Sequence, residues 1–405
     1  MDYIHAAKQV TDQAEIDQIM EVALSTHYAG GAKADEFSKK LKKFLKVKNV
    51  VLCNSGSSAN LLAMSAAKEL YGLKDGDEVI TTACGFPTTV NPIIQNGLIP
   101  VFIDVDLGTY VANLATVEAA IGERTKAIFM AHTLGNPFSE REVREMCDTY
   151  GMVLISDCCD ALGATYEDRH VGTFSRFATL SHYPAHQLSC GEGGTVYGQS
   201  DWANVTVKSL AEWGRSCYCE PGKDNTCGKR FCWNYETLPY GFDHKYVYER
   251  IGYNLKMSDL NAAVGVAQMD KLEGFVEARR KNHTELWLDF TFHGLDEYFI
   301  LPKDTLKSKP SPFGFCLTIR DGMPFTRLEL VRFLEENQIG TRQLFGGNLI
   351  RHPAYKDVKY KVAGSLENSD KIMMDSFWFG VHPAITYIER DYILDKFVEF
   401  TRMHV

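Results

Sequence analysis

The sequence predicts an α/β protein with a large domain built on a mainly parallel sheet and a small α+β C-terminal domain. Between about 75 and 160, short apolar strands alternate with amphipathic helices, as in βαβ units and parallel sheets. After a long helix predicted over 258–283, a strand at 314–319 and a helix at 326–337 indicate a second, smaller unit. We therefore expect domains at 1–284 and 285–405.

The composition narrows the class of protein. The chain has 405 residues, of which 45% are hydrophobic and 23% charged, as in an ordinary globular protein. Its net charge of −9 argues against a nucleic-acid or anionic-membrane partner. No apolar run approaches the roughly 20 residues of a membrane span, and the N-terminus lacks a signal-peptide pattern. We expect a cytoplasmic protein.

Each element is predicted from the spacing of apolar residues. The first part of the chain should form helices over 12–27 and 34–46, a buried strand over 50–53 and an alanine-rich helix over 58–70. The alternating region should then form strands at 78–81, 99–103, 127–130 and 153–156, with helices at 88–96, 114–121 and 139–149. Ligands of such sheets bind beyond the carboxyl ends of the strands, so candidate site residues are sought there.

Three strand ends carry such candidates. Gly56, Ser57 and Ser58 follow the strand at 50–53 and begin a helix, an arrangement that suits a phosphate group; a turn with no ligand is the alternative. Asp157 ends the strand at 153–156, as a functional carboxylate or as a helix cap. Phe86 follows the strand at 78–81 and is a ligand-stacking ring or a core residue.

The stretch 181–194 holds Ser181, His186 and the turn Gly191-Glu192-Gly193-Gly194. It resembles the cofactor segment of the DegT/DnrJ/EryC1/StrS sugar aminotransferases, which use pyridoxal phosphate (PLP), but the family's lysine is replaced by His186. A lysine amine bonds covalently to the cofactor aldehyde; an imidazole does not, yet it moves protons near neutral pH. The resemblance implies non-covalently held pyridoxamine phosphate (PMP), with His186 as the base, as in the family's sugar 3-dehydratases. The alternative is a degenerate aminotransferase with an inert histidine.

The resemblance also implies a fold-type I PLP-dependent transferase fold and roles for further residues. Ser57, Ser58 and Ser181 would bind the cofactor, Phe86 would stack on its ring, and Asp157 would pair with its pyridine nitrogen. Asn254, in Gly252-Tyr253-Asn254, would reach the cofactor phosphate of the other subunit, which implies a homodimer.

Two residues near His186 have more open roles. Asp160 tunes His186 or the cofactor ring, or is a surface or capping acid. Tyr183 assists departure of the hydroxyl or movement of a proton, or is a packing residue.

The eleven cysteines are unevenly spread. Cys217, Cys219 and Cys227 lie in a Gly-, Pro- and Asn-containing loop at 213–234, and the spacing Cys159-x57-Cys217-x1-Cys219-x7-Cys227 resembles the ligand pattern of the family's iron-sulfur 3-dehydrases. Four thiolates hold either a [2Fe-2S] cluster or zinc. A dehydration that leaves a deoxy carbon in the product consumes electrons. A [2Fe-2S] cluster delivers electrons one at a time and zinc cannot, so this chemistry favours the cluster. Cys158 and Cys232 lie beside the set and are alternative ligands.

This subgroup of the family acts on CDP-linked 4-keto-6-deoxyhexoses in lipopolysaccharide dideoxysugar biosynthesis. The resemblance therefore implies such a nucleotide-sugar substrate and an NADH-dependent flavin/iron-sulfur reductase as partner. Arg342, Asn348 and Arg351 would bind the sugar diphosphate, or the arginines are surface residues.

Three alternative functions remain open. A cluster-free 3-dehydratase of a GDP-linked sugar would regenerate PMP with glutamate. An ordinary sugar aminotransferase would need the missing lysine. A non-catalytic cofactor-binding protein would use the cysteines for structural zinc.

Overall fold

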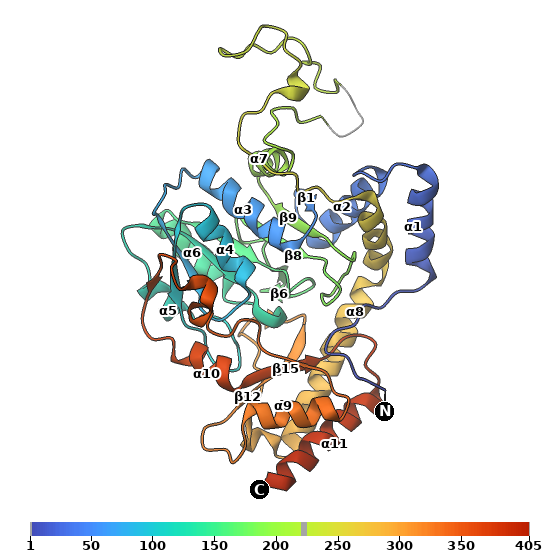
Figure 1. The fold of residues 1–405 in the computed structure, drawn as a ribbon, viewed down its shortest axis with the longest axis vertical. Coiled ribbons are helices and arrows are strands. Elements are labelled where there is room, and N and C mark those ends of the chain that lie inside the picture. The colour runs from blue at the N-terminus through green and yellow to red at the C-terminus, as the bar shows by residue number, and fades with distance from the viewer. Residues whose placement is uncertain (1, 220–224, 405) are drawn as a thin grey trace.

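The computed structural model describes residues 2–219 and 225–404 and has a large domain around an eight-stranded sheet (Figure 1). The strand order is β1-β9-β8-β5-β4-β2-β3-β14. Neighbouring strands from β8 to β14 are parallel, whereas β9 is antiparallel to both β1 and β8. The predicted mainly parallel sheet is confirmed, and the antiparallel strand is an addition.

The observed elements up to residue 157 follow the predicted ones closely, whereas the strands at 177–181 and 194–198 and the helix at 201–211 were not predicted. The sheet of the large domain consists of β1 (Asn49–Cys53), β2 (Glu78–Thr82), β3 (Ile99–Ile103), β4 (Thr125–Ala131), β5 (Val153–Asp157), β8 (Phe177–Ser181), β9 (Gly194–Gly198) and β14 (Lys361–Val362). The helices of this domain are α1 (Gln13–Ser25), α2 (Ala32–Leu45), α3 (Gly56–Leu70), α4 (Pro87–Gln95), α5 (Leu114–Ala119), α6 (Glu140–Tyr150) and α7 (Asp201–Ala211).

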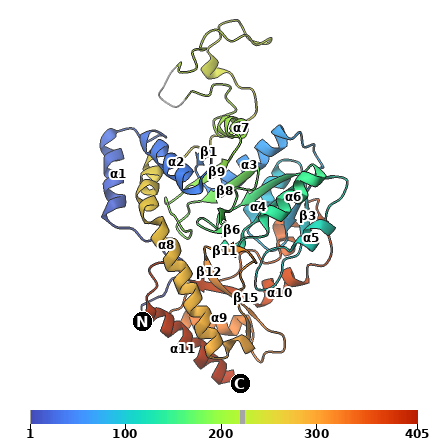
Figure 2. The same ribbon diagram turned by 180° about the vertical axis from the view of Figure 1, so that it is seen from behind.

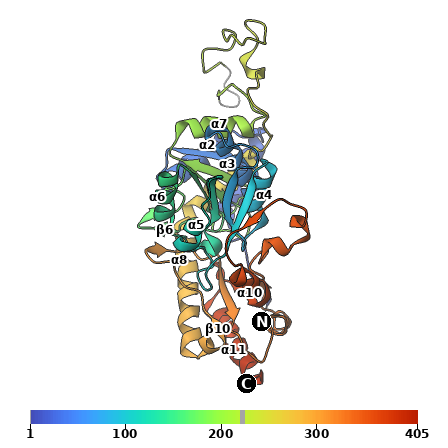
Figure 3. The ribbon, with the colours of Figure 1, turned by 90° about the vertical axis from the view of Figure 1, so that its left-hand side faces the viewer.

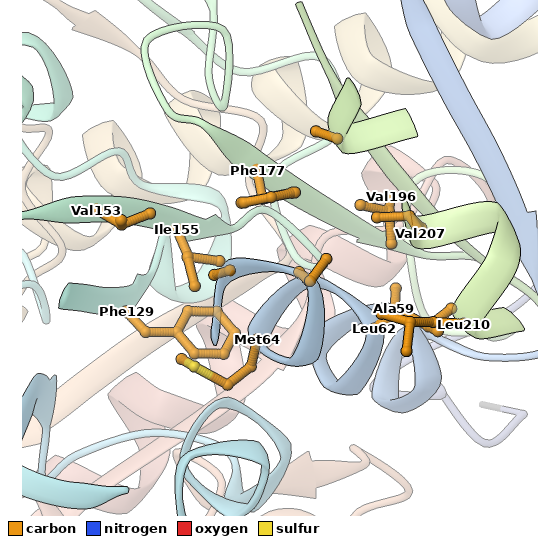
Figure 4. Packing of buried hydrophobic residues seen from close by; sticks show 14 of the residues in the cluster. Ala59, Leu62, Met64, Phe129, Val153, Ile155, Phe177, Val196, Val207 and Leu210 are labelled. Carbon is orange, nitrogen blue, oxygen red and sulfur yellow. The ribbon is translucent and has the colours of Figure 1, made fainter. Parts of the chain in front are cut away.

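Helix α3 lies across the sheet and fixes where the candidate phosphate turn stands. Ala59 and Leu62 are fully buried against sheet residues that include Ile155 and Val196 (Figure 4). Small side chains on this face let the helix approach the sheet closely, and each buried methylene contributes about 0.8 kcal/mol. The N-terminus of α3 is thereby held at the carboxyl end of β1.

Helix α8 (Asp259–Phe292) joins the two parts of the chain (Figure 2). It continues past the predicted end at 283 because Leu286 and Phe290 are buried in the core of the C-terminal part. Position 284 therefore lies inside a helix, and Ile4 of the N-terminus is buried in the same C-terminal core. The division into 1–284 and 285–405 stays a prediction.

The C-terminal part has its own antiparallel sheet in the order β10-β12-β15-β13. Its elements are β10 (Phe299–Ile300), β12 (Gly314–Ile319), α9 (Arg327–Glu336), β13 (Thr341–Arg342), α10 (Glu367–Asp375), β15 (Ser376–Gly380) and α11 (Tyr387–His404). A small third sheet contains β6 (Thr165–Tyr166), β7 (Arg169–His170) and β11 (Ser308–Lys309). Short 3-10 helices are η1 (Thr133–Gly135), η2 (His244–Tyr246), η3 (Leu295–Glu297), η4 (Leu349–Arg351) and η5 (Pro353–Tyr355).

The segment that follows α7 projects from the large domain at the end opposite the C-terminal part (Figure 3). The described residues of 213–234 contain no helix or strand, apart from an isolated bridge between Arg215 and Tyr248. The predicted loop is confirmed for these residues. Within 2–219 and 225–404, no helix is long and apolar enough to cross a membrane.

We expect the stability of the fold to decrease steeply as the pH falls from about 7 to about 5. Burial lowers the pKa of His132 and His182 to about 3, and burial is the main cause that lowers the pKa of His283 and His382 to about 4. In the unfolded chain these imidazoles have a pKa of about 6.5. Between these values the unfolded chain binds more protons, so each group lowers the free energy of unfolding by about 2 kcal/mol at pH 5.

Urea unfolding at about pH 7.5 and about pH 5 measures this difference. A His132→Asn variant should show a smaller loss of stability between the two pH values than the wild type. A substitution at the exposed His27, His27→Asn, is the control and should leave the loss unchanged. Equal unfolding midpoints at both pH values would contradict the prediction.

Candidate active site

Four adjacent strands, β1, β9, β8 and β5, bring the predicted residues to one edge of the sheet. Cys53 at the end of β1 pairs with Gly194 at the start of β9, and Gly194 also pairs with Ser181 at the end of β8. Asp157 at the end of β5 pairs with Thr179 on β8. The α3 turn, Ser181 and Asp157 therefore share this edge, as predicted for a parallel sheet.

The turn into α3 packs tightly against the ends of the neighbouring strands. A Cβ atom added at Gly56 would lie 2.5 Å from Ser181 Cβ and 3.0 Å from Cys159 Sγ, and one added at Gly194 would lie 2.1 Å from the Ser55 carbonyl oxygen. Ser55 Oγ accepts a hydrogen bond of 3.1 Å from Ser58 N. The first N–H groups of a helix otherwise lack intrahelical partners, so this helix end fits a phosphate group.

Asp157 is buried and held by three donors. Asn60 Nδ2 and Thr89 Oγ1 each donate to Asp157 Oδ2 at 2.7 Å, and Cys159 N donates to Asp157 Oδ1 at 3.0 Å. Thr179 Oγ1 donates to Asn60 Oδ1 at 2.6 Å and extends the network. No helix follows Asp157 directly in the described chain, so the helix-cap interpretation is wrong. The network fixes the carboxylate where a cationic ring nitrogen could pair with it.

His186 stands in a turn in which its N–H donates to the Tyr183 carbonyl oxygen at 3.0 Å. Its buried Nδ1 has no hydrogen-bond partner and lies 3.6 Å from Asp160 Oδ1. Burial, with smaller effects of His182 and Arg279, lowers the pKa of His186 to about 3. Burial, with the nearby Asp157 charge, raises the pKa of Asp160 to about 7. The imidazole is therefore neutral at pH 7, with a titrating carboxyl group beside it.

Arg279 on α8 holds this turn from behind and was not predicted. Its guanidinium is buried and donates to the carbonyl oxygens of Ala185 and His186 at 3.2 Å and of Phe313 at 3.2 Å. The His186 ring also packs on Phe313, with 5.1 Å between the ring centroids. These contacts fix the orientation of the His186 side chain. Asn60 and Thr89 were likewise missed, although a buried asparagine in an alanine-rich helix is a detectable signal.

Two aromatic side chains at this edge are open to solvent. Phe86, after β2, is 52% exposed and touches Phe345 edge-on at a centroid distance of 5.8 Å. The interpretation of Phe86 as a core residue is wrong, and its free face fits a stacked ring. Tyr183 is also 52% exposed. Asn254 is exposed on the large domain, where the neighbouring Leu255 carbonyl oxygen accepts from Asn54 N at 2.8 Å.

Two of the three predicted substrate residues, Asn348 and Arg351, meet at the carboxylate of Asp370. An isolated bridge between Cys84 and Asn348 brings Asn348 near Phe86, but Asn348 is buried and donates to Asp370 at 2.7 Å. Arg351 pairs with the same carboxylate at 2.6 Å. Arg342 is exposed and donates to the Thr341 carbonyl oxygen. A role of these three residues in substrate binding stays a prediction.

The four predicted cluster cysteines do not meet in the described chain. Cys159 Sγ lies beside Gly56 and Ser181, whereas Cys219 Sγ accepts a hydrogen bond of 3.3 Å from Cys227 N in the projecting loop. Across the described residues, no group of three or more His, Cys, Asp or Glu side chains is arranged to hold a metal ion. Of the alternative ligands, Cys158 is fully buried and Cys232 is exposed.

Comparison with known proteins shows similarity over nearly the whole chain. Residues 9–398 match the DegT/DnrJ/EryC1/StrS aminotransferase family. The lipopolysaccharide biosynthesis protein RfbH of Salmonella typhimurium is 50% identical over 396 residues, 97% of this chain and 90% of that protein. The dTDP-4-dehydro-2,6-dideoxy-D-glucose 3-dehydratase of Saccharopolyspora spinosa is 47% identical over 402 residues, 98% of this chain and 86% of that enzyme.

Among solved structures, the E. coli GDP-4-keto-6-deoxy-D-mannose-3-dehydratase with bound hydrated PLP superposes with a TM-score of 0.88 at 25% identity. The superposition covers 98% of this chain and 100% of the E. coli chain. The predicted fold, that of the PLP-dependent aminotransferases, is confirmed.

Proposed function

Because the chain belongs to the DegT/DnrJ/EryC1/StrS aminotransferase family, we propose that it removes the C3 hydroxyl of a nucleotide-linked 4-keto-6-deoxysugar with PMP as cofactor. The observation that carries this proposal is His186, which stands in the place of the family's lysine with Nδ1 unpartnered and 3.6 Å from Asp160. An imidazole there retains proton transfer and loses covalent attachment of the cofactor. The 47% identity to a named 3-dehydratase supports it.

The residues at the sheet edge have complementary tasks in this proposal. PMP, when bound, supplies an amine for the C4 ketone and a ring that accepts electrons. Ser57, Ser58 and Ser181 hold its phosphate, and Phe86 covers its ring. Asp157, fixed by Asn60 and Thr89, keeps the pyridine nitrogen protonated.

His186 moves the proton in this site. Its Nδ1 faces Asp160, so Nε2 is the nitrogen that meets the ligand and takes the proton. Asp160 then stabilises the imidazolium, because a carboxylate close to a cation favours the charged form. Tyr183, exposed beside this turn, assists departure of the C3 hydroxyl.

Replacement of a hydroxyl by hydrogen consumes two electrons and two protons and releases water. We propose that a [2Fe-2S] cluster on Cys159, Cys217, Cys219 and Cys227 delivers the electrons singly, from an NADH-dependent flavin/iron-sulfur reductase. The cysteine spacing supports this part. The resemblance to the subgroup supports a CDP-linked substrate. The motif Gly252-Tyr253-Asn254 supports an active homodimer in which Asn254 contacts the cofactor phosphate of the other subunit. Arg342, Asn348 and Arg351 would bind the sugar diphosphate.

Anaerobic purification followed by metal analysis tests the reductive step. We expect about two irons and two sulfides per chain and a visible absorbance that dithionite bleaches. A Cys232→Ser variant should keep the iron, because Cys232 is outside the proposed set. Zinc, or no metal, would exclude electron transfer through a cluster on these cysteines. Turnover with CDP-, dTDP- and GDP-linked 4-keto-6-deoxyhexoses identifies the nucleotide of the substrate.

A cluster-free reaction is the second candidate. The likeness to the E. coli GDP-sugar 3-dehydratase favours it, as does the separation of Cys159 from the loop cysteines in the described chain. In that case the product would form without a reductase and would require glutamate to regenerate PMP. Product formation with labelled glutamate and no reductant distinguishes the two reactions.

A further inference from the structure

A loop of the C-terminal part, residues 343–349, pairs with the segment of the large domain that leads into Phe86. Gly346 N donates to the Gly85 carbonyl oxygen at 3.1 Å. Two further backbone contacts continue this pairing: a hydrogen bond of 2.9 Å from Leu349 N to the Ala83 carbonyl oxygen, and an antiparallel bridge between Asn348 and Cys84. The proposed stacking ring is therefore carried by a backbone that the loop 343–349 holds in place.

The ring of Phe345, in the middle of this loop, links two sides of the candidate site. It is half-buried and meets Phe86 edge-on, with 5.8 Å between the ring centroids. It also meets Phe313 edge-on at 6.2 Å, and Phe313 packs on the His186 ring at 5.1 Å. Contacts between neighbouring rings therefore run from the proposed stacking ring to the proposed base, and Phe345 is the residue that joins their two halves.

The backbone of Phe345 is in an unfavourable conformation. Its φ of 47° lies in the left-handed region, which bulky side chains rarely adopt. A hydrogen bond of 2.7 Å from Phe345 N to the Gln343 carbonyl oxygen closes a tight turn there. Strain of this kind persists only where the surrounding structure imposes it, and it clusters at functional sites. Glycine would adopt the same φ without strain, so the strain points to a need for the aromatic ring.

The elements on both sides of the Phe345 ring are anchored. Trp378 Nε1 donates to the Gln343 carbonyl oxygen at 3.0 Å and holds the start of the loop. On the other side, Phe313 N donates to the Leu134 carbonyl oxygen at 3.0 Å, and the Phe313 ring packs against Trp378 at 5.3 Å. A ring between two anchored elements transmits a displacement of one to the other, because packed interiors have few voids that could absorb it.

We infer that Phe345 is a positioning residue, which holds the Phe86 ring and the His186 imidazole at the separation that the reaction needs. It acts on Phe86 directly and on His186 through Phe313. A displacement of about 1 Å between reacting groups can lower a rate about 10²-fold, so loss of this ring should have effects beyond those of ordinary packing. The inference rests on the proposed function for the roles of Phe86 and His186.

A Phe345→Leu variant tests the link to Phe86 through the affinity for PMP, measured by absorbance. We expect the affinity to fall about 2- to 10-fold, as for the loss of one aromatic pair. In a Phe86→Leu background the same change should have almost no further effect, because the two residues act through one contact. Phe345→Tyr keeps the ring and should restore the wild-type affinity. Phe333→Leu is the matched control and should keep it, since Phe333 is also half-buried in the C-terminal part but packs on Phe400.

The link to His186 is tested in the ligand-free protein by NMR with histidine labelled in the ring. The His186 signal, identified by its absence in His186→Asn, should shift in Phe345→Leu and keep its wild-type position in Phe333→Leu. In the presence of PMP and substrate, exchange of the aminomethyl hydrogen with D₂O should slow about 10- to 100-fold in Phe345→Leu.

Additive losses of affinity in the double variant, or an unchanged His186 signal in Phe345→Leu, would overturn the inference and leave Phe345 with a packing role. If Phe345→Leu does not fold, Phe345→Gly replaces it in each measurement, since glycine relaxes the φ of this position. Wild-type protein that binds no PMP would contradict the proposed function, whereas the NMR comparison needs no cofactor and still decides whether Phe345 positions His186.

Discussion

Substitution of His186 by asparagine is expected to lower the rate of C3 dehydration by about 10²- to 10⁴-fold, the usual contribution of a positioned general base. Asparagine keeps a polar side chain of similar size but accepts no proton at neutral pH. The turn around it should persist, because Arg279 binds the backbone carbonyl oxygens of Ala185 and His186 and not the imidazole. PMP binding should therefore be nearly unchanged.

The measurement is the exchange of the aminomethyl hydrogen of bound PMP with D₂O, followed by NMR in the presence of substrate. This exchange should be lost in His186→Asn, while titration of PMP by absorbance gives the wild-type affinity. Exchange within tenfold of the wild-type rate would show that another group is the base. A Tyr183→Phe variant is a useful companion, since it should retain the exchange and slow only the steps after it.

The sequence predicted β1, β2, β3, β4 and β5 because each is a short apolar run, and helices separate these runs along the chain. It predicted neither β8 nor β9. The residues of both strands are buried throughout, and such a pattern does not show that β9 runs antiparallel to its neighbours. Strand β14 was missed for another reason. Lys361 and Val362 are both exposed, so no hydrophobic pattern marks them.

The sequence predicted those site residues that lie at the end of a strand, because ligands of such sheets bind there. Asp157 and Ser181 are such residues, and the structure places them on the same edge. The residues that support Asp157 and the His186 turn, namely Asn60, Thr89 and Arg279, lie in helices and act through contacts that link distant parts of the chain. Sequence spacing also fails to show that the four predicted cluster cysteines form no metal-holding group within the described chain, because a linear pattern carries no distances.

Substitution of Asp157 by asparagine is the second change with a large expected effect. An amide cannot hold a proton on the pyridine nitrogen as a carboxylate does, so the ring should lose its ability to accept electrons. By analogy with the loss of one preorganised electrostatic group, we expect kcat to fall about 10²- to 10³-fold. KM for the sugar should change less, because the proposed contact of Asp157 is with the cofactor ring and not with the sugar.

The absorbance of bound PMP as a function of pH reports the protonation of its ring nitrogen directly. In Asp157→Asn the ring should lose its proton at lower pH than in the wild type. Thr89→Val is the matched control: it removes one of the two donors to Asp157 Oδ2 but keeps the charge. Its effect on kcat should be much smaller and its ring should titrate close to the wild-type value. An unchanged titration in Asp157→Asn would mean that this carboxylate positions the neighbouring Cys159 backbone, whose N–H it accepts at 3.0 Å, and does not act on the cofactor.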